Sequence, residues 1–282
     1  QKLFDQYGVR PTYLVTYPVA TTQSSVELLK AFLKDGKCEI GAHCHPWNTP
    51  PFEEEINVFN SMLCNLSEAL IQRKLSVLHE AISESFSIVP ESFRAGRWAF
   101  SPAVARVLHR LSYRVDSSVT PFIDWSVHHG PDYSRFPFNS YRFLPDDIAT
   151  PNDNGALLEV PVSIGFLQGN FDRCHKYATH IERHAWKRLR LAGILNRLGL
   201  LNKVLLSPEQ TDLKKMIKLA ERLRKMHKPY LNMFFHSSNL TAGLTPFVRT
   251  RSDETGFLKK IECFLAYCSD NGIESMTLKQ LK

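Results

Sequence analysis

The chain has 282 residues, of which 43% are hydrophobic and 22% are charged, and this composition is typical of a globular protein. It has no run of about 18 or more apolar residues, which excludes an ordinary membrane-spanning helix. The formal net charge is +7, and the positive excess is concentrated in residues 173–228, so the remainder is slightly acidic.

Short apolar runs alternate with helical patterns along the chain. Strands are predicted at residues 11–17, 37–43, 91–97, 112–118, 156–164, 229–236 and 272–277. Helices are predicted at residues 24–36, within 53–86, and at 101–111, 207–226 and 255–271. Strands separated by helices predict an α/β fold with a parallel sheet, and seven such strands suit an irregular (β/α) barrel. We expect a single domain over residues 1–282.

A basic helical insert, residues 173–206, interrupts this alternation. It mixes leucines with arginines and lysines, as in a helix that buries one stripe and shows a cationic face. One hypothesis is that the insert covers the barrel mouth or makes peripheral contact with an anionic polymer or membrane surface. The alternative is a helix that only packs on the barrel wall.

Two histidines lie one residue apart in the stretch EIGAHCHPWNTPP, which begins at Glu39. On an extended segment His43 and His45 would point to the same side, with Cα atoms about 6.6 Å apart. Imidazoles at that spacing can hold one Zn²⁺. The pair therefore indicates either a metal site or two hydrogen-bonded loop residues.

Further ionisable residues follow the later predicted strands. Arg94 and Arg97 lie three residues apart and suit carboxylate binding. Asp116 directly follows an apolar run and needs a partner there. His236 ends the apolar run MFFH and is either a satisfied core residue or an acid–base group. Because active sites of (β/α) barrels lie at the carboxyl ends of the strands, we expect these residues to converge with the histidine pair.

In this order the motifs resemble those of the NodB-type polysaccharide deacetylases, carbohydrate esterase family 4. The shared features are His-x-His-Pro after Glu-Ile-Gly, then Phe-Arg, Asp-Ser-Ser and Phe-Phe-His-Ser, and the opening from Leu3 to Val15 is similar to a helix and second strand of that fold. The resemblance implies a hydrolase that deacetylates N-acetylated carbohydrates with a divalent metal, usually zinc. It implies that His43 and His45 bind the metal, Arg94 orients a catalytic carboxylate, Asp116 is an acid of the site, and His236 is the general acid. We assign substrate contacts to three further residues, Trp47, Arg97 and Trp98.

The sequence departs from the family pattern at two points. The family's two histidines are usually four residues apart, whereas position 47 is Trp47. The family's first motif, an Asp-Asp pair that supplies the general base and a metal ligand, has no counterpart before Leu3. We therefore expect an N-terminally truncated sequence that lacks the general base and one metal ligand and binds metal weakly.

Other classes of function stay open. The chain could be a non-catalytic module that binds an anionic partner, or a hydrolase of small amides on the same fold. The six cysteines form no CxxC pair, which favours reduced thiols and a cytoplasmic location. No nucleic-acid partner is expected.

Overall fold

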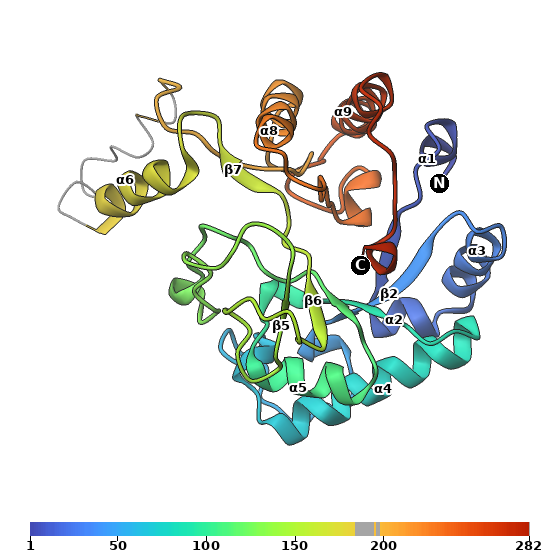
Figure 1. Cartoon of the computed structure of the whole chain (residues 1–282). Helices are drawn as coiled ribbons and strands as arrows, with labels where there is room; N and C mark the ends of the chain where they lie inside the picture. The colour runs from blue at the N-terminus through green and yellow to red at the C-terminus, as the bar shows by residue number, and fades with distance from the viewer. Residues whose placement is uncertain (184–194, 196–197, 282) are drawn as a thin grey trace. The chain divides into compact units, whose positions relative to one another are not determined.

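The computed structural model describes residues 1–183, 195 and 198–281, and the chain forms two compact units (Figure 1). Unit 1 comprises Gln1–Pro161 and Ile273–Lys282, and unit 2 comprises Val162–Gly272. Unit 1 contains a six-stranded sheet with its helices. Unit 2 contains a two-stranded sheet and three helices within the described residues.

The sheet of unit 1 has the order β1-β2-β3-β4-β6-β5. Its strands are β1 (Thr12–Val15), β2 (Glu39–Cys44), β3 (Ser92–Ala95), β4 (Val115–Asp116), β5 (Tyr141–Phe143) and β6 (Leu157–Glu159). All neighbours pair in parallel except β5, which runs antiparallel at the edge. Every residue of β3 and β6 is buried, as expected for parallel strands covered on both faces. The predicted α/β fold with a parallel sheet is therefore confirmed.

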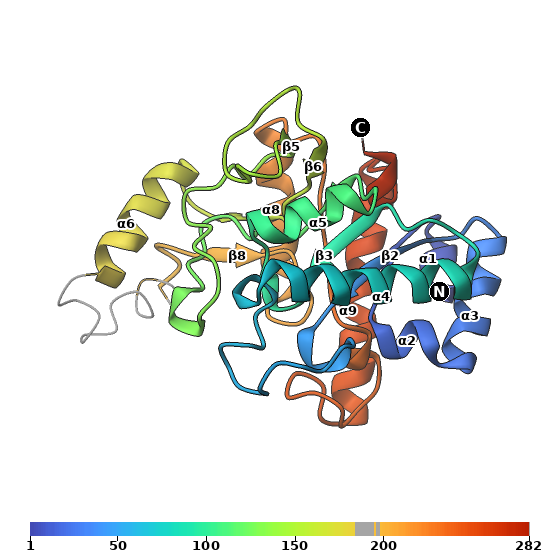
Figure 2. The ribbon, with the colours of Figure 1, turned by 90° about the horizontal axis from the view of Figure 1, so that it is seen from below.

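Five helices belong to unit 1: α1 (Lys2–Gln6), α2 (Tyr17–Thr21), α3 (Gln23–Lys34), α4 (Glu68–Phe86) and α5 (Pro102–Arg110). Ser67 caps α4 and Ser101 caps α5, each accepting a hydrogen bond from a backbone N–H of the first turn. Figures 1 and 2 show α4 and α5 side by side. The buried side of α4 carries apolar residues at helical spacing, among them Ile71, Leu75, Leu78 and Ile82. Their burial attaches α4 to the core of unit 1.

The C-terminal segment packs against the start of the sheet. The backbone N–H of Leu278, in the short 3₁₀ helix η7 (Leu278–Gln280), donates to Thr12 Oγ1 over 2.9 Å. The next N–H, of Lys279, donates to the buried carboxylate of Glu39 over 3.1 Å. The strand predicted at residues 272–277 does not form; residues 273–277 have no regular secondary structure and lead to η7.

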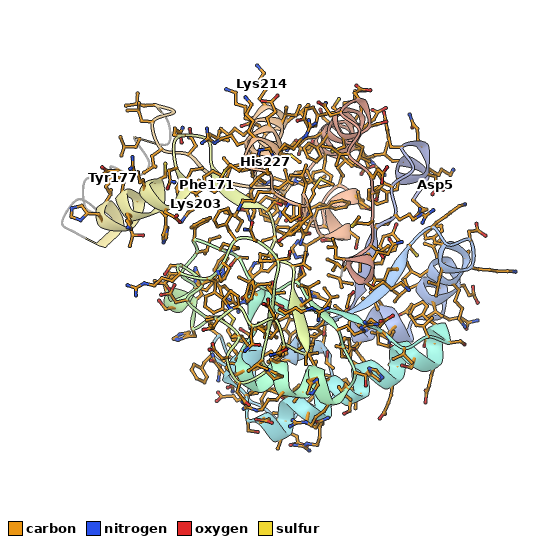
Figure 3. The ribbon with its side chains drawn as sticks, in the orientation of Figure 1. Asp5, Phe171, Tyr177, Lys203, Lys214 and His227 are labelled. Atoms are coloured by element: carbon orange, nitrogen blue, oxygen red, sulfur yellow. The ribbon has the colours of Figure 1, made fainter. Side chains whose placement is uncertain are left out.

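Unit 2 contains the antiparallel pair β7 (Ile164–Phe166) and β8 (Lys203–Leu205). Its helices are α6 (Phe171–Arg183), α8 (Leu213–Lys225) and α9 (Arg251–Asp270). Phe171 is buried against Gly165, where a Cβ would overlap its ring. Figure 3 shows Phe171 at the β7 end of α6 and Tyr177, which is exposed, further along the helix. Burial of Phe171 therefore anchors the first turn of α6.

Three predictions in unit 2 need comment. The helix predicted from Ser207 begins at Leu213, because Asp212 accepts the hydrogen bond from Lys215 N and is the N-cap. Residues 229–236, predicted as a strand, are not assigned to a strand, although Ser163 N donates to Asn232 O over 3.1 Å and Phe234 N to Leu206 O over 3.3 Å. Of the basic insert, residues 184–194 and 196–197 lie outside the described residues.

No helix of the described ranges has the length and hydropathy needed to cross a membrane.

Candidate functional site

The predicted histidine pair lies where β2 ends. His43 is the penultimate residue of β2 and is the register partner of Arg94 on β3. Its Nδ1 lies 2.8 Å from the carbonyl oxygen of Arg94. The rings of His43 and His45 are perpendicular, with centroids 4.6 Å apart. The structure therefore brings the two imidazoles together, as their spacing predicted.

The hydrogen bond of His43 decides whether its ring suits a metal. A carbonyl oxygen can only accept, so His43 Nδ1 donates and the neutral ring carries its lone pair on Nε2. Histidines that bind metals are commonly oriented in this way, through a hydrogen bond from the other ring nitrogen. Within residues 1–183, 195 and 198–281, however, no group of three or more His, Cys, Asp or Glu side chains could hold a metal ion. The residues present fit one half of a metal site, formed by two histidines.

The surroundings of His45 hold its ring on two sides. Trp47, in the short 3₁₀ helix η1 (Pro46–Asn48), lies against it with ring centroids 4.2 Å apart and an interplanar angle of 35°. On another side Gly96 approaches so closely that a Cβ there would overlap His45 Nδ1 and lie 2.6 Å from Cys44 O. Trp47 is 41% exposed. The predicted substrate contact Trp47 therefore lies on His45 and still offers ring surface to solvent.

A buried lysine fixes the loop that follows the histidine pair. Lys74 of α4 has no exposed side-chain surface, and its Nζ donates to Pro46 O, Thr49 O and Pro51 O over 3.0, 2.7 and 2.7 Å. The carboxylate of Glu54 lies 2.9 Å from the same Nζ. A buried ammonium needs such partners, so Lys74 joins the 46–54 loop to α4.

Arg94 and its neighbours form the next part of the site. Arg94 is buried, and its Nε and Nη2 donate to Ser117 O and Ser117 Oγ, both over 2.7 Å. Its guanidinium lies 5.3 Å from the ring centroid of Trp98, within cation–π range. Burial lowers the pKa of Arg94 to about 10, although the charges of Asp116 and Glu159 oppose this shift. These hydrogen bonds go to Ser117, whereas the predicted partner of Arg94 was a carboxylate.

The turn after Arg94 is strained. Arg97 and Trp98, in the 3₁₀ helix η3 (Gly96–Trp98), have φ angles of 55° and 61°. Residues with a Cβ rarely adopt positive φ, and residues that do so are frequent at functional sites. Arg97 Nη1 donates to Ser61 Oγ, so its guanidinium is attached to the neighbouring loop. No residue pattern in the sequence predicted this backbone conformation.

Asp116 is fully buried beside a second carboxylate that sequence reasoning missed. Its register partner on β6 is Glu159, which is also fully buried. Asp116 accepts from Ser118 N and Ser118 Oγ over 3.0 and 2.7 Å. Glu159 Oε1 accepts from Val119 N, while its Oε2 receives no hydrogen bond from any described residue. The signal in the sequence was one ionisable residue inside the apolar run ALLEVPV.

The two carboxyls cannot both ionise at low cost. Burial, followed by the charge of Asp116, raises the pKa of Glu159 well above its usual value of 4.5. Burial also raises the pKa of Asp116, opposed by its hydrogen bonds with Glu159 and Ser118. Adjacent buried carboxyls share a proton, and Glu159 as the acid would donate to Asp116. The pair then carries one negative charge, and the Arg94 cation brings the net charge of the three groups close to zero.

His236 belongs to unit 2, where its partner is a carboxylate absent from the sequence-based site. Glu209 Oε1 lies 2.9 Å from His236 Nδ1 and also accepts from the backbone N–H of His236. Glu209 was interpreted as a residue of the first helical turn, so no signal indicated its role. Within unit 1, contacts link His43 to His45 and Arg94, His45 to Trp47, and Arg94 to Trp98. Arg97 follows the end of β3, and Asp116 ends the neighbouring strand β4. The convergence of His236 with them stays a prediction.

No protein-family model and no curated protein sequence matches this chain. Solved structures do match it. A Mycobacterium smegmatis protein assigned as a polysaccharide deacetylase aligns over 99% of this chain and 72% of its own length, with a TM-score of 0.55 and 14% identity. A 4-alpha-glucanotransferase from Thermococcus litoralis aligns over 99% of this chain and 34% of its own, with a TM-score of 0.54 and 12% identity.

A family 4 carbohydrate esterase from Streptomyces lividans, in complex with acetate, covers 45% of this chain and 57% of its own, at 16% identity. Its TM-score of 0.33 is too low to bear on the fold. The two longer alignments define the class of structure: the chain has a fold of the polysaccharide deacetylase type, as its motifs predicted. A glucanotransferase shares this fold, so the reaction must be argued from the site.

Proposed function

We propose that this chain is a polysaccharide deacetylase-like hydrolase, which cleaves the amide carbon–nitrogen bond of N-acetylated sugars. The fold supports a carbohydrate-active enzyme of this type. The observation that carries the proposal is the His43–His45 pair, with His43 Nδ1 bonded to the Arg94 carbonyl at the carboxyl ends of parallel strands. Ligands and substrates of parallel α/β sheets bind at that end.

Each residue has a role in the proposal. A divalent metal, most simply zinc, would be held by His43 and His45 and would polarise the acetyl carbonyl and acidify water. His236 would protonate the leaving amine from its Nε2. Arg94 would orient the catalytic carboxylate that acts as general base, and Asp116 would join that network. Trp47, Arg97 and Trp98 would contact the sugar. The same proposal includes three further expectations: an irregular barrel with a basic insert, a single catalytic domain and a cytoplasmic location.

The test measures acetate release and zinc content together. The purified chain is incubated with an N-acetylglucosamine oligomer and Zn²⁺, beside the variants His43→Ala and His45→Ala and the control His109→Ala. His109 is an exposed residue of α5. We expect zinc affinity to fall by at least about 10–100-fold in the first two variants, because each loses an imidazole ligand, and to stay unchanged in the control.

The results that would contradict the proposal are clear. Zinc binding that is indifferent to both substitutions would remove the metal site. Zinc binding without acetate release, but with hydrolysis of a small amide, would favour the alternative substrate class on the same fold. Binding of neither metal nor sugar would leave the non-catalytic alternative.

A further inference from the structure

The carboxylate of Glu209 is the centre of a polar network in unit 2. Its side chain is 3% exposed, and one oxygen, Oε1, lies within hydrogen-bond distance of three nitrogen atoms. These are His236 N at 2.5 Å, His236 Nδ1 at 2.9 Å and Asn239 Nδ2 at 2.7 Å. A carboxylate this buried is retained only when hydrogen bonds replace its lost hydration. Two of its three bonds go to one histidine.

The direction of the bonds in this network follows from backbone donors. The N–H groups of Phe247 and Val248 donate to Thr245 Oγ1 over 3.3 and 3.2 Å. Thr245 therefore uses its own proton to donate to Asn239 Oδ1. This fixes the amide of Asn239 with Nδ2 facing Glu209, where it donates to Oε1. Glu209 Oε1 thus accepts from the backbone N–H of His236 and from Asn239. Because an ionised carboxylate can only accept, His236 Nδ1 is the donor in the third contact.

The loop that carries Glu209 is itself held by α9. Lys260 Nζ donates to Pro208 O over 2.6 Å and to Thr211 O over 3.2 Å, one residue before and two residues after Glu209. Thr211 is buried, and its hydroxyl donates to Leu205 O at the end of β8. The carboxylate is therefore fixed from both sides.

From this network we propose that Glu209 is a positioning residue, which holds His236 as the Nδ1–H tautomer and keeps the lone pair of the neutral ring on Nε2. A carboxylate or carbonyl bonded to one ring nitrogen is the usual device that selects the other for proton transfer. The role in catalysis rests on the proposed function, because it requires His236 to exchange its proton with substrate. The tautomer itself does not depend on any activity.

The experiment reads the tautomer directly. The full chain is labelled with ¹⁵N-histidine, and long-range ¹H–¹⁵N spectra are recorded above the titration range of histidine, with His236 assigned from a His236→Gln variant. We expect the wild-type spectrum to show His236 protonated at Nδ1. In Glu209→Ala the acceptor is gone, so the ring should move to the Nε2–H form. In Glu209→Gln an acceptor oxygen remains, and the wild-type tautomer should persist.

The matched control is Glu221→Ala, which removes an exposed carboxylate from α8 in the same unit and should leave the His236 signals unchanged. A wild-type spectrum with His236 protonated at Nε2 would overturn the proposal, even if Glu209→Ala fails to fold. An unchanged tautomer in a folded Glu209→Ala protein would also overturn it. If the chain deacetylates sugars, Glu209→Ala should lower kcat by about 100-fold or more with little change in KM. Absence of that activity would count against the proposed function and not against the tautomer.

Discussion

The two histidine-bearing regions of this molecule are positioned by different means. His43 lies in a strand whose neighbours on both sides are paired in register, and its ring bonds to a backbone carbonyl of the next strand. His236 lies in extended chain before the 3₁₀ helix η6 (Ser237–Leu240), and a single side-chain oxygen holds its ring and its backbone.

This difference indicates how each region responds to substitution. Backbone register resists point mutation, because no side chain makes the ladder. A network of side chains depends on every member, since removing one acceptor leaves buried donors unsatisfied. In the region of His43, substitutions should therefore be most harmful where the backbone packs closely or where the following loop is held by Lys74. In the region of His236, substitution of Glu209 itself should be the most harmful.

The largest effect should come from removing the Lys74 ammonium, which binds the 46–54 loop to α4. In Lys74→Met three carbonyl oxygens and Glu54 lose a buried ammonium. Removing one partner of a buried ion pair typically costs about 3–5 kcal/mol, and we expect that loss in the free energy of unfolding, measured by urea titration. Lys30→Met, at an exposed position of α3, should change it by less than about 0.5 kcal/mol. A loss below about 1 kcal/mol for Lys74→Met would show that water replaces the ammonium.

A smaller effect should follow from a methyl group placed between the two strand ends. In Gly96→Ala the new Cβ must displace His45 or Cys44 O, and we expect a loss of about 1–3 kcal/mol in the free energy of unfolding. The matched substitution Gly256→Ala, within α9 and with no neighbour in reach, should instead stabilise by about 0.5–1 kcal/mol. Equal effects at the two glycines would contradict the close approach of Gly96 to His45.

The third effect is a slope of stability against pH rather than a loss on substitution, and it arises at the Asp116–Glu159 pair. Folding raises the pKa of Glu159 well above its usual value of 4.5. Above pH 4.5 the folded protein therefore binds more protons than the unfolded protein. The contribution of Glu159 to stability is thus present in full below pH 4.5 and declines as the pH rises through the raised pKa, by up to about 1.4 kcal/mol per pH unit. Glu159→Gln imitates the protonated acid and should flatten this decline. Urea titrations from pH 5 to pH 8 with identical slopes for both proteins would exclude the shared proton.

Periodicity and motif order allowed the parallel sheet, the helix start at Ser101, and the local grouping of His43, His45, Arg94 and Asp116 to be predicted. The start of α4 at Ser67 was not predicted, because the sequence indicated only one or two helices within residues 53–86. These features depend on residues close in sequence or on the rule that parallel strands end at one edge. Glu159 and Lys74 could not be found, because their partners lie 43 and 20 or more residues away and depend on register or helix packing. The role of Glu209 was not predicted for a further reason. Ser-Pro-Glu has the pattern of a helix start, but the helix is capped at Asp212.

The enclosure of Lys74 makes its amine a reporter of motion. Its Nζ has no surface that an acylating reagent could reach, whereas the amine of Lys30, an exposed residue, can react at once. Covalent labelling of Lys74 therefore has to wait until the 46–54 loop separates from α4, and its rate follows how often that loop opens. Because the loop includes Trp47, which lies against His45, the labelling rate at one lysine also measures how often the histidine pair loses its cover.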